Sequence, residues 1–153
     1  MARSQGFTLV EMMVTVAVAA ILISIAMPSL NRIADSNALK ATTRDLVSTI
    51  NTARSQSIST RTDVEVEPAT GGWADGWSIT YDSAATEASQ DYVPRDGVTV
   101  SRVGTNDSMI FRSRGGLSGG AATLTVCHQD LGNGRTISVS FLGKVTTAVK
   151  EDC

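Results

Sequence analysis

The chain has 153 residues and carries 13 lysines and arginines against 15 aspartates and glutamates, which gives a formal net charge of −2. This length accommodates one small domain and one further segment. Because the net charge is negative, the protein as a whole does not attract nucleic acid electrostatically. The composition therefore excludes nucleic-acid binding that depends on an overall positive charge.

The first thirty residues contain a long apolar segment. From Phe7 to Leu30 the residues are apolar or small, and the one charged side chain is that of Glu11. A helix of about 20 such residues, rising about 1.5 Å per residue, spans the hydrocarbon core of a bilayer. A carboxylate inside such a segment costs about 2.5–3.5 kcal/mol on insertion, so we expect Glu11 to have a function.

A short polar leader precedes the apolar segment. Met1–Gln5 forms this leader, and Gly6 stands at the junction. An ordinary secretory signal would place its cleavage site after the apolar region. Cleavage at Gly6 would instead leave the helix on the mature protein, with a new amino terminus at Phe7. That amine lies four residues from Glu11 and supplies the missing counter-charge.

The run Gly6-Phe7-Thr8-Leu9-Val10-Glu11 resembles the class III signal of type IV pilins and pseudopilins. In that family a prepilin peptidase cuts after the glycine and methylates the new terminal residue, here Phe7. The glutamate, here Glu11, helps each incoming subunit to dock through a neighbour's amino terminus. The resemblance therefore implies a protein of the bacterial inner membrane with a periplasmic domain. From the residues alone, a plain single-pass anchor with an accidental glutamate stays the alternative.

The helix is expected to continue beyond the apolar segment. Pro28 cannot donate to the carbonyl of Ser24, so we predict a kink or local loosening there. We predict one helix from Thr8 to near Ser59. We expect the chain to be divided into four parts: a leader at 1–6, a transmembrane or filament-core helix at 7–30, an amphipathic helix at 31–61 and a globular domain at 62–153. Six residues at alternating spacings of four and three form its apolar stripe: Leu39, Thr43, Leu46, Ile50, Ala53 and Ser57.

After Arg61 the pattern changes to the period of two that is typical of strands. Short strands joined by glycine turns predict antiparallel pairing, in two small sheets or one bent sheet against the helix, and hence an α+β fold. We read Asp82–Asp91 as a loop, and Trp73 and Trp77 as a partly buried lid, the alternative being an exposed aromatic contact. Seven candidate strands cover Val64–Val66, Trp77–Tyr81, Val98–Val100, Met109–Arg112, Thr123–Cys127, Thr136–Phe141 and Val145–Val149.

The last third narrows the resemblance. Ile110-Phe111-Arg112, the glycine loop Arg114–Gly120 and the runs at 123–127 and 135–140 follow in the order seen in FimU/FimT minor pilins and GspH-type pseudopilins. The resemblance implies a pilin fold and a structural subunit without catalysis or cofactor. It implies a minor pilin that primes or caps a type IV pilus, or alternatively a pseudopilin of a type II secretion system. The implied partners are other minor pilins, the major pilin, prepilin peptidase, the inner membrane and the pilus assembly platform.

Cys127 and Cys153 are the two cysteines of the chain. Disulfides persist in the periplasm, and a bridge here would close a loop of about 25 residues, worth roughly 3 kcal/mol in the chain-entropy model. Two free thiols are the alternative. Zinc needs more ligands than two cysteines and one histidine provide. Pairing of a cysteine at the candidate strand Thr123–Cys127 with a terminal cysteine resembles the FimU branch more than FimT.

Other candidate sites are weak. The Gly115–Gly120 loop lacks the Gly-Lys-Ser/Thr and the following helix of a phosphate loop. His128, the single histidine, has no recognisable triad partners. Glu65 and Glu67 are better explained as a solvated strand face than as a calcium site. We therefore predict no catalytic residue, no metal site and no cofactor.

DNA binding is the sharpest alternative function. Some FimT-like pilins capture DNA through a glycine–arginine-rich loop near the C terminus. This chain has Gly134-Arg135, and Lys144 could join it, but no second arginine follows nearby. Because affinity for phosphates grows with the number of cations, Arg135 and Lys144 are only a weak candidate DNA contact, and nucleic acid is not an expected partner.

Overall fold

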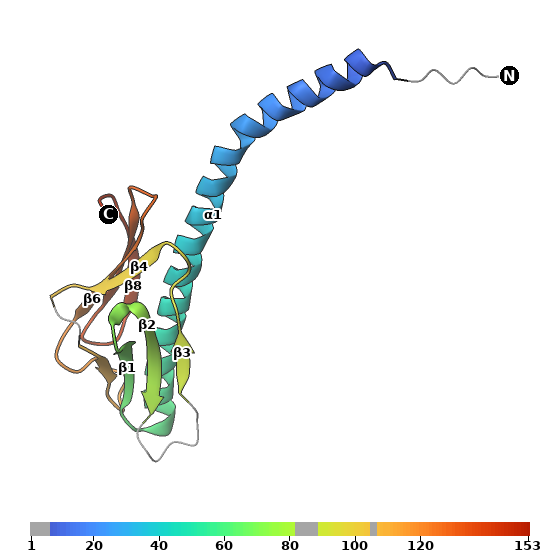
Figure 1. The fold of residues 1–153 in the computed structure, drawn as a ribbon. Coiled ribbons are helices and arrows are strands. Elements are labelled where there is room, and N and C mark those ends of the chain that lie inside the picture. Colours follow the sequence, from blue (N-terminus) through green and yellow to red (C-terminus); the bar gives the residue numbers. More distant parts are fainter. Residues whose placement is uncertain (1–6, 82–88, 105–106) are drawn as a thin grey trace. The chain divides into compact units, whose positions relative to one another are not determined.

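The computed structural model describes residues 7–81, 89–104 and 107–153. These residues form one helix, α1 (Leu9–Thr60), and eight strands (Figure 1). They divide into two compact units, one ending at Ala34 and one comprising Asp35–Cys153. The single helix predicted from Thr8 to near Ser59 is confirmed to within one residue at each end.

The first unit consists of the amino-terminal half of α1. The Thr8 hydroxyl accepts a hydrogen bond from the backbone N–H of Glu11 at 3.2 Å. A threonine at this position satisfies one of the free N–H groups of the first turn and so starts the helix. The described side chains of this half are exposed, including every large apolar one from Leu9 to Ile33.

The second half of α1 presents the predicted stripe to the core. All six stripe residues from Leu39 to Ser57 are buried, which confirms that prediction. Two buried threonines donate their hydroxyls to carbonyls one turn earlier: Thr43 to Leu39 at 2.7 Å and Thr49 to Asp45 at 2.8 Å. The helix stops because Arg61 adopts φ 58°, a left-handed conformation that is typical of helix C-termini.

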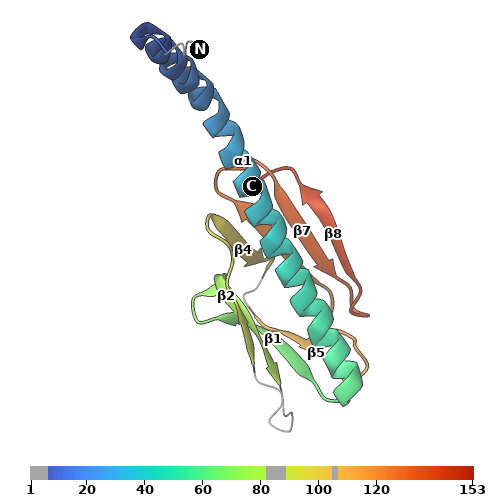
Figure 2. The ribbon, with the colours of Figure 1, turned by 90° about the vertical axis from the view of Figure 1, so that its right-hand side faces the viewer.

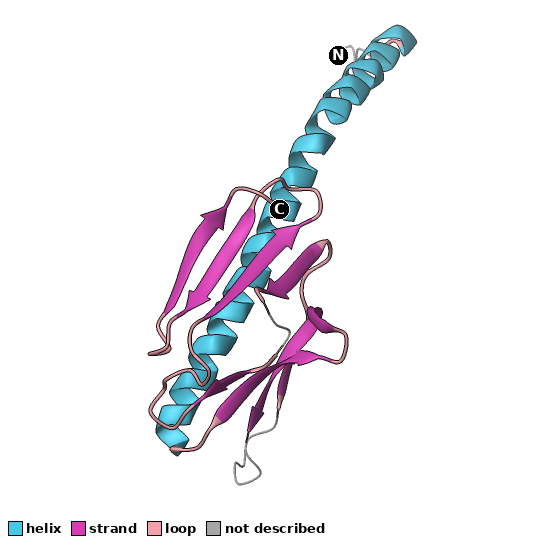
Figure 3. Ribbon diagram, turned by 90° about the vertical axis from the view of Figure 1, so that its left-hand side faces the viewer, coloured by secondary structure: helices cyan, strands magenta, loops and turns pink. Residues whose placement is uncertain are grey.

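The strands form two antiparallel sheets of four strands each, in the orders β3-β2-β1-β5 and β4-β6-β7-β8. Seen from opposite sides, both sheets lie on one side of the second half of α1 (Figures 2 and 3). This confirms the antiparallel strands against the helix and, of the two predicted arrangements, selects two small sheets over one bent sheet. The first sheet contains β1 (Val64–Ala69), β2 (Gly72–Tyr81), β3 (Gln90–Tyr92) and β5 (Met109–Phe111); the second contains β4 (Val98–Arg102), β6 (Ala122–His128), β7 (Gly134–Val139) and β8 (Val145–Lys150).

The segment Asp82–Asp91, read from the sequence as a loop, differs in part. Its residues 82–88 lie outside the described part of the chain, but Gln90 and Asp91 belong to β3. This strand pairs antiparallel with Trp77–Ile79 of β2. Three residues are too few to show an alternating pattern, so the sequence contains no periodic signal for β3.

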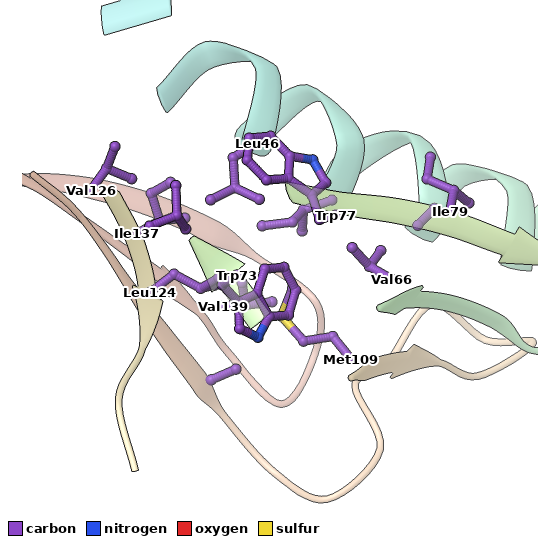
Figure 4. Packing of buried hydrophobic residues seen from close by; sticks show 14 of the residues in the cluster. Leu46, Val66, Trp73, Trp77, Ile79, Met109, Leu124, Val126, Ile137 and Val139 are labelled. Carbon is purple, nitrogen blue, oxygen red and sulfur yellow. The ribbon is translucent and has the colours of Figure 1, made fainter. Parts of the chain in front are cut away.

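The prediction that Trp73 and Trp77 form a partly buried lid is wrong. Their side chains belong to the centre of the core, with residue exposures of 1% and 2% (Figure 4). The reason is that the glycine-containing segment from Gly72 to Gly76 is part of β2, which begins directly after the turn that follows β1. The pairing of β1 with β2 shifts register between Pro68 and Ala69, which oppose Trp77 and Gly72. The extra residues of β2 form a bulge, and both indoles are buried in the core on its two sides.

Candidate functional site

The predicted processing site lies at the start of the first unit. Gly6 is outside the described residues, whereas Phe7 is exposed and precedes α1 by two residues. Glu11 stands in the first turn of the helix, three residues after the capping Thr8. A carboxylate is favoured there because the free N–H groups give the start of a helix a partial positive charge.

From Leu9 to Leu30, in the first half of α1, apolar or small residues occur on all sides of the helix, and Glu11 is the one charged residue. This half is long and apolar enough to cross a membrane, and none of its most apolar window is buried. A helix that is apolar on all sides is stable in water only when other apolar groups cover it. This half can therefore lie in a bilayer or among other apolar helices. Pro28 falls within it, and α1 is continuous on both sides; the kink there stays a prediction.

A disulfide joins Cys127 in β6 to Cys153, with the two Cα atoms 5.7 Å apart. It crosses β7 at Gly134, the residue that pairs with Cys127 in the sheet. A side chain at Gly134 would collide with the Cys153 sulfur and the Val126 carbonyl. The bridge thus fastens the chain after β8 to the end of β6, an inner strand of the second sheet, and the glycine leaves the space that it needs.

The two candidate DNA contacts are not brought together. Arg135 pairs with Val149 at one end of the β7–β8 hairpin, whereas Lys144 lies in the turn at the other end, next to the Val139–Val145 pair. The Arg135 guanidinium donates to the carbonyl of Gly134 at 3.1 Å. The hairpin therefore separates these cations by nearly the length of β7.

His128 has surroundings that the sequence did not indicate. It is 5% exposed, and its Nε2 lies 3.7 Å from the carboxylate of Asp35 on α1. Its Nδ1 accepts the backbone N–H of Asp130 at 3.2 Å and lies 3.9 Å from that residue's carboxylate. No periodicity or motif connects positions so far apart in the chain, so only the fold could reveal this cluster.

Asp35, His128 and Asp130 are the one group of potential metal ligands among the described residues. Their ligand atoms lie within 4.8 Å of one another. The two carboxylates, however, face different nitrogens of the ring, and Nδ1 already accepts a hydrogen bond. We therefore interpret the cluster as a contact that holds β6 against α1.

Two family models match the chain. The model described as type II transport protein GspH matches residues 42–143, and that of the prokaryotic N-terminal methylation motif matches residues 1–27. A search among curated proteins matched none of them to this chain.

Three solved structures share the fold. The type IV minor pilin FimU of Pseudomonas aeruginosa is similar in two crystal forms, with 22% and 20% identity and TM-scores of 0.65 and 0.62. These matches cover 77% and 75% of this chain and 96% and 99% of FimU. The minor pseudopilin EpsH of the type 2 secretion system of Vibrio cholerae has 11% identity and a TM-score of 0.57, covering 72% of this chain and 95% of EpsH.

At these identities the structures show a common fold and no more, whereas the GspH model spans most of the chain. The methylation-motif match includes most of the exposed apolar half of α1, and the GspH match lies within the packed second unit. The chain therefore belongs to the GspH family of minor pilins and pseudopilins, which are structural subunits and not enzymes.

Proposed function

We propose that the protein is a minor pilin that primes or caps the assembly of a type IV pilus. The observation that carries this proposal is the first half of α1, which is apolar on all sides, uncovered, and acidic only at Glu11 in its first turn. Such a helix needs apolar neighbours, and a filament made of similar helices provides them.

Processing and assembly follow from the same segment. Cleavage after Gly6 would expose the amine of Phe7, close to the first turn of the helix. In an apolar environment the Glu11 carboxylate needs a partner of opposite charge, because an unpaired one is costly. The amine of a neighbouring subunit would supply that charge and would set each subunit at a fixed height along the filament. Before assembly, the helix would hold the chain in the inner membrane with its domain in the periplasm.

The partners that this role requires are prepilin peptidase, the assembly platform, other minor pilins and the major pilin. The second candidate function is that of a pseudopilin in a type II secretion system. It is favoured by the GspH match and by the likeness to EpsH. We prefer the pilus because the FimU structures superpose with the larger TM-scores and because the C-terminal disulfide resembles the FimU branch.

A deletion experiment tests the choice between these functions. Deleting the gene should remove surface pili while the major pilin stays in the membrane, and the full chain supplied in trans should restore them. Sheared pili from the restored strain should contain the protein in small amounts by immunoblotting. If piliation is unchanged and export of a secreted enzyme fails instead, the pseudopilin function is correct and the pilus function is wrong.

A further inference from the structure

Two loops of the second unit form a groove that the proposed function does not use. One loop follows β5, and the other is the turn between β7 and β8. The groove has a volume of about 450 Å³. Its lining consists of Arg112, Ser113, Arg114, Gly116 and Leu117 from the first loop and Phe141 and Leu142 from the turn.

The two loops are fixed to each other and to the helix. The N–H of Leu117 donates to the carbonyl of Phe141 at 2.9 Å. Arg54 of α1 donates from Nε to the carbonyl of Gly115 at 3.2 Å. Gly143 has φ 75°, and the Gly115 carbonyl occupies the place where its Cβ would be, so the loops approach as closely as backbones can. The groove is therefore preformed.

The groove exposes apolar surface that the fold itself does not require. Phe141 and Leu142 are 64% and 71% exposed, although they are adjacent in a tight turn where small polar residues are favoured. Beside them Leu117 is buried and forms part of the core. Covering the two exposed side chains would remove apolar surface from water, which favours binding of a partner with an apolar group.

The charges at the groove are positive. Arg112 lies 3.5 Å from the Asp63 carboxylate and donates to the Ser118 hydroxyl at 3.0 Å. Arg114 forms no hydrogen bond or ion pair with another described residue. The lining contains no acidic residue, although the chain as a whole has a net charge of −2. A guanidinium group matches the geometry of a carboxylate and binds it with two parallel hydrogen bonds.

We propose that this groove binds an acidic segment of another subunit of the assembly, one in which carboxylates flank a large apolar side chain; the identity of the partner as a subunit rests on the proposed function. The apolar side chain would lie against Phe141 and Leu142, and a carboxylate would pair with Arg114. Nucleic acid fits less well, because phosphate binding requires several free cations and Arg112 is already paired.

The test measures binding of a short fluorescent peptide, with leucine and phenylalanine flanked by aspartates, to the full mature protein in detergent micelles. A peptide with asparagines in place of the aspartates is the first control. Arg114→Glu and Phe141→Ser should each weaken binding by about tenfold or more. Arg135→Glu makes the same change of charge at the far end of the β7–β8 hairpin and should leave binding unchanged. Circular dichroism checks that each variant is folded.

Three results would overturn the proposal: equal binding of the asparagine peptide, equal effects of Arg114→Glu and Arg135→Glu, or tighter binding of single-stranded DNA that is lost in Arg114→Glu. The last would assign the groove to nucleic acid. None of them bears on whether the parent protein enters sheared pili, so failure of this inference is distinguishable from failure of the proposed function.

Discussion

The indole N–H of Trp77 donates a hydrogen bond to the Thr49 hydroxyl at 3.0 Å and thereby joins β2 to α1 inside the core. Trp73 is equally buried, but its Nε1 has no hydrogen-bond partner among the described residues. Trp77 also stacks on Tyr92, with the ring centroids 6.1 Å apart, a contact that a phenylalanine at this position would keep in part. The two indole N–H groups therefore differ in whether they are hydrogen-bonded. The desolvation of an unpaired N–H is unfavourable by about 1–3 kcal/mol, whereas a satisfied one contributes to stability.

This difference predicts unequal losses of stability for two matched substitutions. Trp77→Phe removes the bond to Thr49 and should lower the free energy of unfolding by about 1 kcal/mol or more beyond the loss caused by Trp73→Phe. Trp73→Phe removes an unpaired N–H, which offsets part of the lost packing. Urea denaturation of the full chain in mild detergent, followed by circular dichroism, measures both.

Thr49→Val supplies the control for this prediction. Combined with Trp77→Phe it should cost less than the sum of the two single changes, because both remove the same bond. Additive losses would show that Trp77 stabilises the core by packing alone.

The parts of the fold that the sequence could predict are those with a repeating pattern. The stripe from Leu39 to Ser57 repeats often enough to identify its buried face, and strands such as β6 alternate over their whole length. The short β3 could not be predicted because three residues show no repeat, and the burial of Trp73 could not because buried and exposed residues do not alternate in this part of β2.

The candidate site divides in the same way. The run from Gly6 to Glu11 is contiguous and therefore visible in the sequence. The contact between Asp35 and His128 and the groove at Arg114 and Phe141 are made by residues that are distant in the chain. Their side chains have no special spacing, and only the strand order places them together.

Processing is predicted to occur between Gly6 and Phe7, with methylation of the new terminal amine. Mass spectrometry of the mature amino terminus should find methylated Phe7. Gly6→Val should leave unprocessed precursor in the membrane, because a branched side chain would crowd the peptidase cleft. An intact Met1, or cleavage after the apolar segment, would contradict the pilin pathway.

Glu11 is predicted to act in assembly and not in folding. Glu11→Ala keeps the backbone bond to Thr8 and makes the helix more apolar, so the protein should accumulate in the membrane at a normal level. It should nevertheless enter sheared pili poorly, because the partner amine loses its counter-charge. Thr8→Ala is the control, since it removes the cap but keeps the carboxylate. Incorporation of Glu11→Ala equal to that of the parent would show that the carboxylate is merely tolerated.

The Cys127–Cys153 bridge is predicted to stabilise the second sheet. Replacing both cysteines by serine should lower the free energy of unfolding by roughly 3 kcal/mol, because the unfolded chain gains the freedom of the opened loop. Non-reducing peptide mapping of protein from the periplasmic side should recover the linked pair. Free labelling of both thiols in the native protein would exclude the bridge.

The last prediction separates a pilus subunit from a DNA receptor. The full mature protein in micelles should not bind labelled duplex DNA at physiological salt. Its net charge is negative, which disfavours DNA. The hairpin also holds Arg135 and Lys144 at opposite ends, so the two cations cannot contact the same phosphate group.

Arg135→Ala and Lys144→Ala should accordingly leave the titration unchanged, while the protein co-purifies with other minor pilins. Binding in the micromolar range that strengthens at low salt and disappears in Arg135→Ala would instead assign the protein to DNA uptake, because a salt-dependent affinity reports phosphates neutralised by that cation. Loss of binding in Lys144→Ala alone would place the contact at the β7–β8 turn, beside the groove. The two variants thus locate any DNA contact as well as test for one.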